Sequence, residues 1–161
     1  MLFRSLVPAF NGLGAPWWDP SAQAVIVGMS LATARGDLAR AALDSIILQV
    51  ADVAASLSAA GVPTAALAVD GGMTANADLM LRQASLCALP VMVSRTPELS
   101  ALGAAHAAGL GAGIWTLADL ESLSREYDTI EPDSRDDRQA RLLEDWNDAL
   151  SISRMATEGR Q

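Results

Sequence analysis

A short stretch around residue 70, LAVDGGMTAN, combines residue types that could bind a small molecule. An apolar run ends at Asp70, two glycines follow, and Asn76 lies where a helix is expected to begin. Because glycine has no Cβ, a flat ring can approach the backbone of Gly71 and Gly72 closely, and the Asn76 amide can both donate and accept hydrogen bonds. These residues are candidates for binding a nucleotide. The alternative is a tight turn without a ligand, in which Asp70 accepts hydrogen bonds from backbone N–H groups.

A second loop, SRTPELSALG, follows the next predicted strand and leads into another helix. Thr96, Pro97 and Glu98 are typical of a helix start, as N-cap, first-turn proline and first-turn acid. In a parallel sheet the carboxyl ends of neighbouring strands share one edge, where ligands gather. Two helix N-termini at that edge would favour a phosphorylated ligand.

Other residues that could do chemistry are isolated or wrongly spaced. Gly12 and Gly14 begin a G-x-G-x-x-G pattern, but Trp17 occupies the third glycine position, which excludes the dinucleotide fingerprint. His106 is the only histidine and has no nucleophile paired with it, and Cys87 is interpreted as a core residue. No group of histidines and cysteines has metal-ligand spacing. We therefore expect no catalytic residue and no metal ligand in this chain.

The composition restricts the classes of partner. The 161 residues carry a net charge of −8, which argues against nucleic acid because phosphate backbones need a basic face. The sequence contains no lysine, so a Walker-type phosphate loop is excluded. No apolar run approaches the ~18 residues of a membrane span, and a single cysteine suits a reducing compartment. We expect a cytoplasmic protein that does not bind membranes.

Hydrophobic periodicity predicts an α/β chain in which strands and helices alternate after residue 60. The clearest helix spans 37–60, with Asp37 in its first turn and Gly61 and Pro63 at its end. Its expected buried face comprises Leu43, Ile46, Ile47, Val50, Val53, Ala54 and Leu57. Short apolar runs predict strands in LVPAF, in AVIVGM, at 65–69 and at 90–93, and helices at 76–87 and 99–111. We expect the strands near 66–69 and 91–93 to be parallel, with the small-residue helix 99–111 packed closely on their sheet.

From Thr116 the sequence becomes acidic and amphipathic. Its charge-rich segments and spaced apolar residues predict a solvated helical flank. The side chains expected to turn inward are Leu142, Leu143, Trp146 and Leu150.

Two longer segments carry a resemblance to a known family. VPAFNGLGAPWWDPSAQAVIVGMS and DLARAALDSIILQVADV resemble the C-terminal domain of the FGGY carbohydrate kinases. The places of that family's second signature are filled by Ala24, Ile26, Gly28, Met29, Asp37, Leu38, Ala41, Ala42, Leu43 and Asp44. VDGGMTAN and ALGAAHAAGLGAGIW match later blocks in the same order, so the similarity runs from about Leu6 to Trp115. The phrase GLGAPWWDP is more similar to the glycerol kinase branch than to xylulose or gluconate kinases.

The resemblance implies a ribonuclease-H-like, actin-type ATPase domain that binds ATP with Mg²⁺ against a second domain. Residues 1–115 would be a partial ATP-binding domain lacking its first strands, and 116–161 its acidic helical flank. Gly71 and Gly72 would form the floor of an adenosine pocket, with Asn76 beside it.

The same resemblance implies that an N-terminal kinase domain is missing, and with it the glycerol site and the general base. The isolated chain is therefore expected not to phosphorylate glycerol, and the open sheet edge is expected to cause self-association into a homo-oligomer. Ser100 stands in place of the family's threonine and His106 in place of an aromatic residue. The alternatives are a kinase fragment for another sugar or polyol, and a truncated binding or structural module without catalysis.

Overall fold

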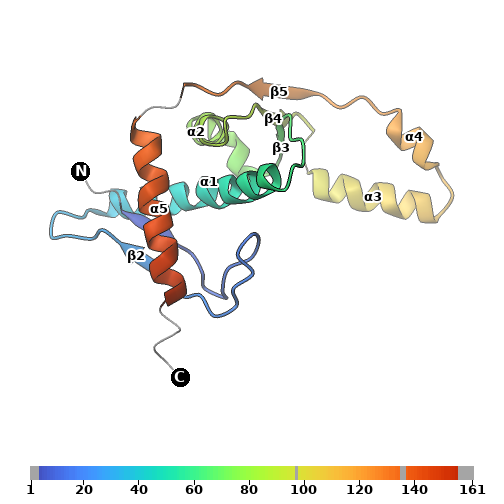
Figure 1. The fold of residues 1–161 in the computed structure, drawn as a ribbon. Coiled ribbons are helices and arrows are strands. Elements are labelled where there is room, and N and C mark those ends of the chain that lie inside the picture. The colour runs from blue at the N-terminus through green and yellow to red at the C-terminus, as the bar shows by residue number, and fades with distance from the viewer. Residues whose placement is uncertain (1–3, 97, 135–136, 156–161) are drawn as a thin grey trace.

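The computed structural model describes residues 4–96, 98–134 and 137–155, and within these ranges the chain is a mixed α/β structure with two small sheets (Figure 1). In chain order the elements are β1 (Ser5–Val7), β2 (Val25–Val27), α1 (Arg35–Ala59), β3 (Leu67–Val69), the 3-10 turn η1 (Gly72–Ala75), α2 (Ala77–Cys87), β4 (Val91–Ser94), α3 (Leu99–Gly111), α4 (Leu117–Glu121), β5 (Tyr127–Ile130) and α5 (Asp137–Met155).

The three-stranded sheet confirms the predicted parallel pair. β3 and β4 are parallel neighbours, with Leu67 opposite Val91 and Val69 opposite Val93, and α2 forms the crossover between them. β5 extends the sheet on the other side of β4 in antiparallel orientation. The sequence did not predict β5, because its residues YDTI lie in the acidic stretch assigned to a helical flank. β3 has a strand partner on one side only in the described part of the chain, so one edge of the sheet is open.

Helix α1 matches the predicted helix at both ends. It begins two residues before Asp37, whose carboxylate accepts a hydrogen bond from the backbone N–H of Ala34 at 2.9 Å. At the other end Gly61 has φ +74°, and its N–H donates to the carbonyl of Ser58 at 3.0 Å. This left-handed glycine closes the helix, as the sequence predicted.

The buried face of α1 differs from the predicted one. Ile46, Val50 and Leu57 are 39, 38 and 41 % exposed. The face turned to the core carries Ala41, Asp44, Ser45, Ile47, Leu48, Ala51 and Ala54, so the prediction is confirmed for Ile47 and Ala54. Periodicity selected a different face because two polar residues, Asp44 and Ser45, lie on the side of α1 that is buried, where the helix contacts α2 and β1. The exposed apolar residues Ile46, Val50 and Leu57, spaced by four and seven, form what we call the α1 strip.

Helix α1 is also long and apolar enough to cross a membrane by length and composition alone. In the structure it is instead a packed helix of a folded unit. It contacts both α2 and β1, and its buried Asp44 forms ion pairs with Arg82 and Arg40. Such a carboxylate, held by two arginines of the same chain, belongs to a protein interior.

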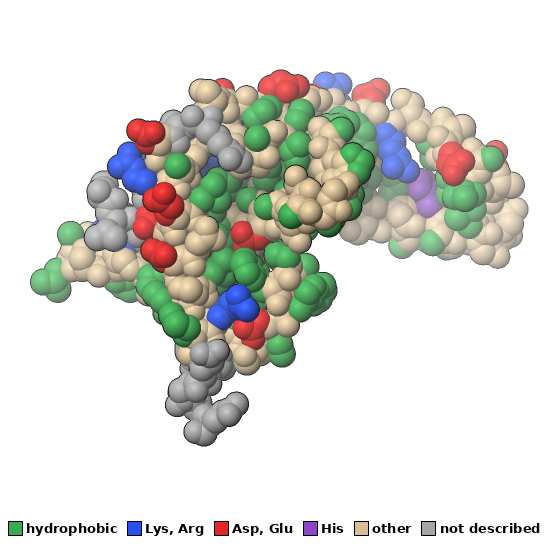
Figure 2. All heavy atoms as spheres, viewed as in Figure 1, with side chains coloured by type: hydrophobic (Ala, Val, Ile, Leu, Met, Phe, Trp, Pro, Cys, Tyr) green, Lys and Arg blue, Asp and Glu red, His purple; other side chains and the backbone are tan. Residues whose placement is uncertain are grey.

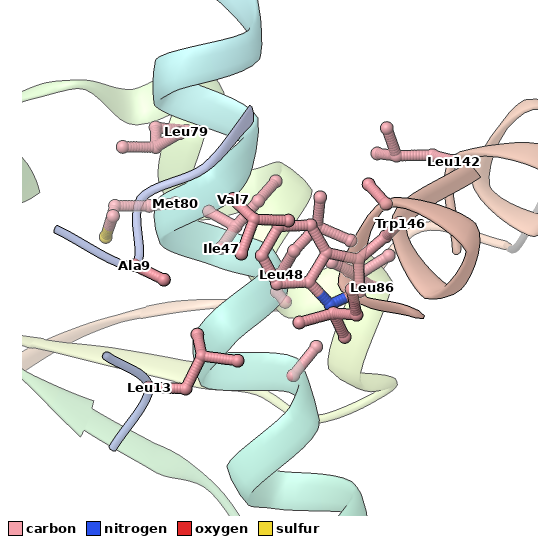
Figure 3. Close-up of a cluster of buried hydrophobic side chains, with 14 of the residues drawn as sticks. Val7, Ala9, Leu13, Ile47, Leu48, Leu79, Met80, Leu86, Leu142 and Trp146 are labelled. Atoms are coloured by element: carbon pink, nitrogen blue, oxygen red, sulfur yellow. The ribbon is translucent and has the colours of Figure 1, made fainter. Parts of the chain in front are cut away.

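The main core lies between α1, α2, α5 and β1 (Figure 3). We call these four elements, together with β2, the body. Val7, Ile47 and Trp146 are at most 1 % exposed and meet there from three different elements. The predicted inward side chains of α5 are confirmed for Leu142, Trp146 and Leu150, which are 7, 0 and 2 % exposed; Leu143 is partly buried against the same cluster.

Residues 98–126, which we call the arm, contain α3 and α4 and project away from the body (Figure 1). The expectation that helix 99–111 covers the sheet is wrong: Gly109 is the only buried residue of α3. Its surface is mostly backbone and small or apolar side chains with few charges (Figure 2). The predicted helix start also differs, because Glu98 is the N-cap and has φ +54°, whereas Pro97 lies outside the described residues. Trp115 packs over α3 at His106 and Gly109, and the other described residues of the helix are not buried.

Candidate functional site

The turn that follows β3 presents bare backbone at the surface. Gly71 has φ +93°, a left-handed conformation that favours glycine. A Cβ built on Gly71 or on Gly72 would have no heavy atom within 4 Å, so the space above both residues is open. Gly72 then begins the 3-10 turn η1, which leads into α2. A planar ligand could therefore rest directly on this backbone.

Asn76 is held in place by the helix that it caps. Its Oδ1 accepts a hydrogen bond from the backbone N–H of Leu79 at 3.1 Å. That bond assigns the amide oxygen to the helix and leaves the Nδ2 group to donate elsewhere. The residue is exposed and directly follows the glycine-containing turn in the chain.

Thr74, rather than Asp70, fixes the turn. The Thr74 hydroxyl and backbone N–H both donate to the carbonyl of Gly71, at 2.7 and 3.1 Å. Asp70 is exposed and accepts no hydrogen bond from another described residue. The interpretation in which Asp70 organises a ligand-free turn is therefore wrong. Its carboxylate is unengaged next to the open backbone.

The end of β4 lies at the same edge, as the parallel register requires. Val69 is opposite Val93, so Asp70 and the glycines leave the sheet beside Ser94 and Arg95. The Arg95 guanidinium pairs with Asp128 of β5, and its Nε donates to Oδ1 at 2.9 Å. The Asp128 carboxylate raises the pKa of Arg95, and the arginine in turn lowers the pKa of that carboxyl. The sequence did not lead us to select Arg95 as a candidate. The feature that could have indicated it is its position as the one basic residue directly after the second strand of the parallel pair.

The remaining candidates have structural roles. A Cβ on Gly12 would lie 2.6 Å from the Pro20 Cα, so this glycine serves a tight loop. Gly113, with φ +70°, lies just after the end of α3, whereas Gly109 lies inside the helix. Its missing side chain makes room for the Trp115 ring, to which a Cβ would approach within 2.1 Å. Trp115 also packs edge-on against the ring of His106 at 5.9 Å, which assigns the histidine to the arm's own packing.

Comparison with known proteins identifies the family. The profile of the FGGY family of carbohydrate kinases, C-terminal domain, matches residues 3–112, which is more than half of the chain. The chain belongs to this family. Among curated relatives, the glycerol kinase of Thermus brockianus is 47 % identical over 146 residues, and that of Dechloromonas aromatica is 44 % identical over 150. These alignments cover 89 and 92 % of this chain, which spans about 30 % of the length of its relatives.

Solved structures of FGGY kinases confirm the fold class. The crystal structure of Plasmodium falciparum glycerol kinase with ADP superposes with a TM-score of 0.74 at 34 % identity, covering 94 % of this chain and 31 % of that one. Xylulose kinase from Rhodospirillum rubrum superposes with a TM-score of 0.71 at 24 % identity, which shows the shared fold alone. The ribonuclease-H-like, actin-type fold is thus that of the family, and the chain is the C-terminal part of a glycerol kinase-like FGGY protein.

Proposed function

We propose that this chain supplies the nucleotide-binding floor of a kinase that transfers phosphate from ATP to glycerol. The observation that carries the proposal is the bare backbone at Gly71 and Gly72, at the shared carboxyl edge of two parallel strands. Ligands of open α/β sheets gather at that edge. Relatives that match nearly the whole chain at 44 to 47 % identity are glycerol kinases, and one structural relative was solved with ADP.

The residues of the turn fit an adenosine. The open space above Gly71 and Gly72 is where a ring would rest, and side chains there would occupy it. The Asn76 Nδ2 group would donate to an acceptor atom on the base or ribose edge. Bound ATP would supply the phosphoryl group, with Mg²⁺ on its phosphates. Within this chain the proposal assigns no ligand to the metal and no base to the acceptor alcohol.

The rest of the kinase must come from outside the described chain. Three apolar or unpaired surfaces support this: the outer edge of β3, the α1 strip and the exposed helix α3. We propose that the remaining domain of a longer cytoplasmic protein covers them, and that a second copy of the chain covers part of them in its absence. A glycerol kinase is favoured over a kinase for another polyol because the curated relatives are glycerol kinases.

Nucleotide binding is tested by titrating ADP into the ¹⁵N-labelled chain. We expect the amide signals of 70–76 to shift with a Kd near 1 mM, equivalent to about −4 kcal/mol, because only one wall of the pocket is present. Gly72 has no left-handed φ, so Gly72→Leu should remove binding by filling the space rather than by straining the backbone. Gly36→Leu is the matched control, since Gly36 is equally open but lies in α1. Shifts that spare 70–76 would refute the assignment.

Catalysis is tested with a coupled assay for ADP release from ATP, Mg²⁺ and glycerol. The isolated chain should show no turnover, because losing a positioned base alone costs ~10²–10⁴ in rate. Turnover by the isolated chain that Gly72→Leu abolishes would contradict the proposal that this chain supplies only the nucleotide-binding floor.

Self-association through the open edge of β3 is tested by sedimentation velocity. We expect dimers or larger species at high concentration, and a strictly monomeric chain would contradict this expectation.

A further inference from the structure

A cavity lies away from the glycine turn, between the C-terminal half of α1, the end of α2 and α5. It has a volume of about 900 Å³, within the ~300–1,000 Å³ typical of small-molecule sites. None of its lining residues belongs to the 70–76 turn. Its wall includes Asp52, Ala55, Ser58, Leu86, Leu143 and Asn147. Small and aliphatic side chains thus surround one carboxylate and a few neutral polar groups.

Asp52 is the charged group of this wall, and only one of its two oxygens is engaged. Its Oδ2 accepts hydrogen bonds from the indole N–H groups of Trp17, at 3.2 Å, and Trp146, at 2.9 Å. Its Oδ1 accepts none from the described residues, and no described side chain forms an ion pair with it. Partial burial raises the pKa of this carboxyl, and the two indoles offset the effect only in part. Burying a carboxylate without a counter-ion lowers the stability of the folded state.

The helices around the cavity add negative potential. α1 ends at Ala59 and α2 at Cys87, and both ends contribute to the wall. Carbonyl groups give a helix C-terminus a partial negative charge, which a basic residue in the last turn often balances. Neither helix has one, and the lining residues include no arginine or histidine. Asp52 and the two helix ends therefore all make the electrostatic potential in the cavity more negative.

We propose that this cavity binds a small organic cation, with an ammonium group at Asp52 Oδ1 and a short aliphatic chain against Leu86 and Leu143. The aliphatic wall suits the body of such a ligand better than a bare metal ion, which would need several oxygen ligands in place of one. The site is independent of the proposed nucleotide floor, because the two share no residue.

The direct test titrates n-butylammonium into the ¹⁵N-labelled chain and follows the tryptophan indole signals. We expect those of Trp17 and Trp146 to move, because both N–H groups donate to the carboxylate that would receive the cation. The Trp115 indole donates to the His106 carbonyl at 2.9 Å, far along the chain in the arm, and should stay fixed as an internal control. n-Butanol has a similar chain without the charge and should bind at least tenfold more weakly.

Two variants separate the site from general attraction to an acidic protein. Asp52→Asn keeps an oxygen for both indoles but removes the charge, and should weaken n-butylammonium binding at least tenfold. Asp148→Asn, on an exposed position of α5, changes the net charge equally and should alter binding less than twofold. ADP shifts at 70–76 should be the same in both variants. Equal loss in the two variants, equal binding of n-butanol, or unmoved Trp17 and Trp146 signals would overturn the proposal.

A final comparison distinguishes a free ligand from a side chain of another protein segment. Nα-acetyl-lysine amide carries the same ammonium group on a polypeptide backbone. Tighter binding of n-butylammonium would support a small-molecule ligand, and tighter binding of the lysine amide would support a side chain as the natural cation. Failure of both compounds to bind would refute a cation site.

Discussion

The body and the arm differ in packing far more than in apolar character. Helix α3 is more apolar than α1 over its length, yet only Gly109 of its residues is buried, whereas α1 buries seven. In the body, α1 contacts α2 and β1, and α5 contacts β1 and β2, the strands of the two-stranded sheet. In the arm, Trp115, which follows α3 in the chain, packs back against Gly109 and His106 of that helix. Burial therefore depends on a partner surface rather than on composition alone.

The α1 strip shows the same effect inside the body. Ile46 and Val50 are exposed, whereas Ala51 and the ion-paired Asp44 are buried on the opposite side of the helix. A row of large apolar side chains on the surface is typical of a face that another element covers. The proposed covering domain would have three separate features to pack against, namely the α1 strip, α3 and the outer edge of β3.

The largest difference between the two regions is expected from removing one tryptophan in each. Trp146 is fully buried, so Trp146→Ala should lower the free energy of unfolding by about 3–5 kcal/mol through the cavity it leaves. Trp115 is partly exposed in the arm, and Trp115→Ala should change it by no more than about 0.5 kcal/mol. Urea unfolding followed by circular dichroism measures both. Equal losses would show that arm and body unfold together.

Local signals made much of the fold predictable. Asp37 and Gly61 marked the ends of α1 because caps act within one helical turn. The runs at 65–69 and 90–93, separated by a helical segment, predicted the parallel pair. The glycine turn was predictable as a candidate site because its residues are contiguous, and its use of Gly71, Gly72 and Asn76 for a nucleotide stays a prediction.

Features that depend on distant residues were not predictable in this way. β5 is a strand because β4 offers it an edge, although YDTI carries little hydrophobic pattern. The contact of Trp17 and Trp146 with Asp52 joins three segments far apart in the sequence. The role of Gly109 depends on Trp115 folding back over the helix. Each is decided by packing, on which single-sequence periodicity carries no information.

The next largest effect should stay within the arm. Alanine is normally more favourable than glycine in a helix, by about 1 kcal/mol, but Gly109→Ala would place a Cβ 2.1 Å from Trp115. We expect the ring to be displaced and the amide protons of α3 to exchange about tenfold faster, with the global stability of the body unchanged. Gly103→Ala is the control, because that position is open, and it should slow exchange in α3. A drop in global stability with Gly109→Ala would couple the arm to the body.

A smaller effect should come from two strained residues with the same backbone angle. Ala88 ends α2 in the body and Glu98 begins α3 in the arm, and both have φ +54°. Ala88→Gly should raise the free energy of unfolding by about 1 kcal/mol, because glycine adopts this region without a steric penalty. Glu98→Gly relieves the same strain but should leave global unfolding unchanged if the arm lies outside the cooperative unit. Chemical denaturation gives the free energy of unfolding of both variants. An equal gain in the two would show that the arm unfolds together with the body.

The smallest effect concerns the charge in the body. Burial raises the pKa of Asp52 above its ordinary value of 3.8, so the folded state disfavours the charged form relative to the unfolded state. Its contribution to stability is fully present below the unfolded pKa and is lost as the pH rises through the folded pKa. Asp52→Asn lacks this titration, so the variant should gain stability relative to the unmodified chain as the pH is raised from 4 towards 7. Asp119→Asn in the arm is the control: hydrogen bonds from Thr116 lower the pKa of this exposed carboxyl, and the change should leave the global pH profile unaltered. Thermal unfolding across this pH range measures the difference between each variant and the unmodified chain. A constant difference for Asp52→Asn would show that the Asp52 carboxyl has the same pKa in the folded and unfolded states, and that the two indoles fully offset its burial.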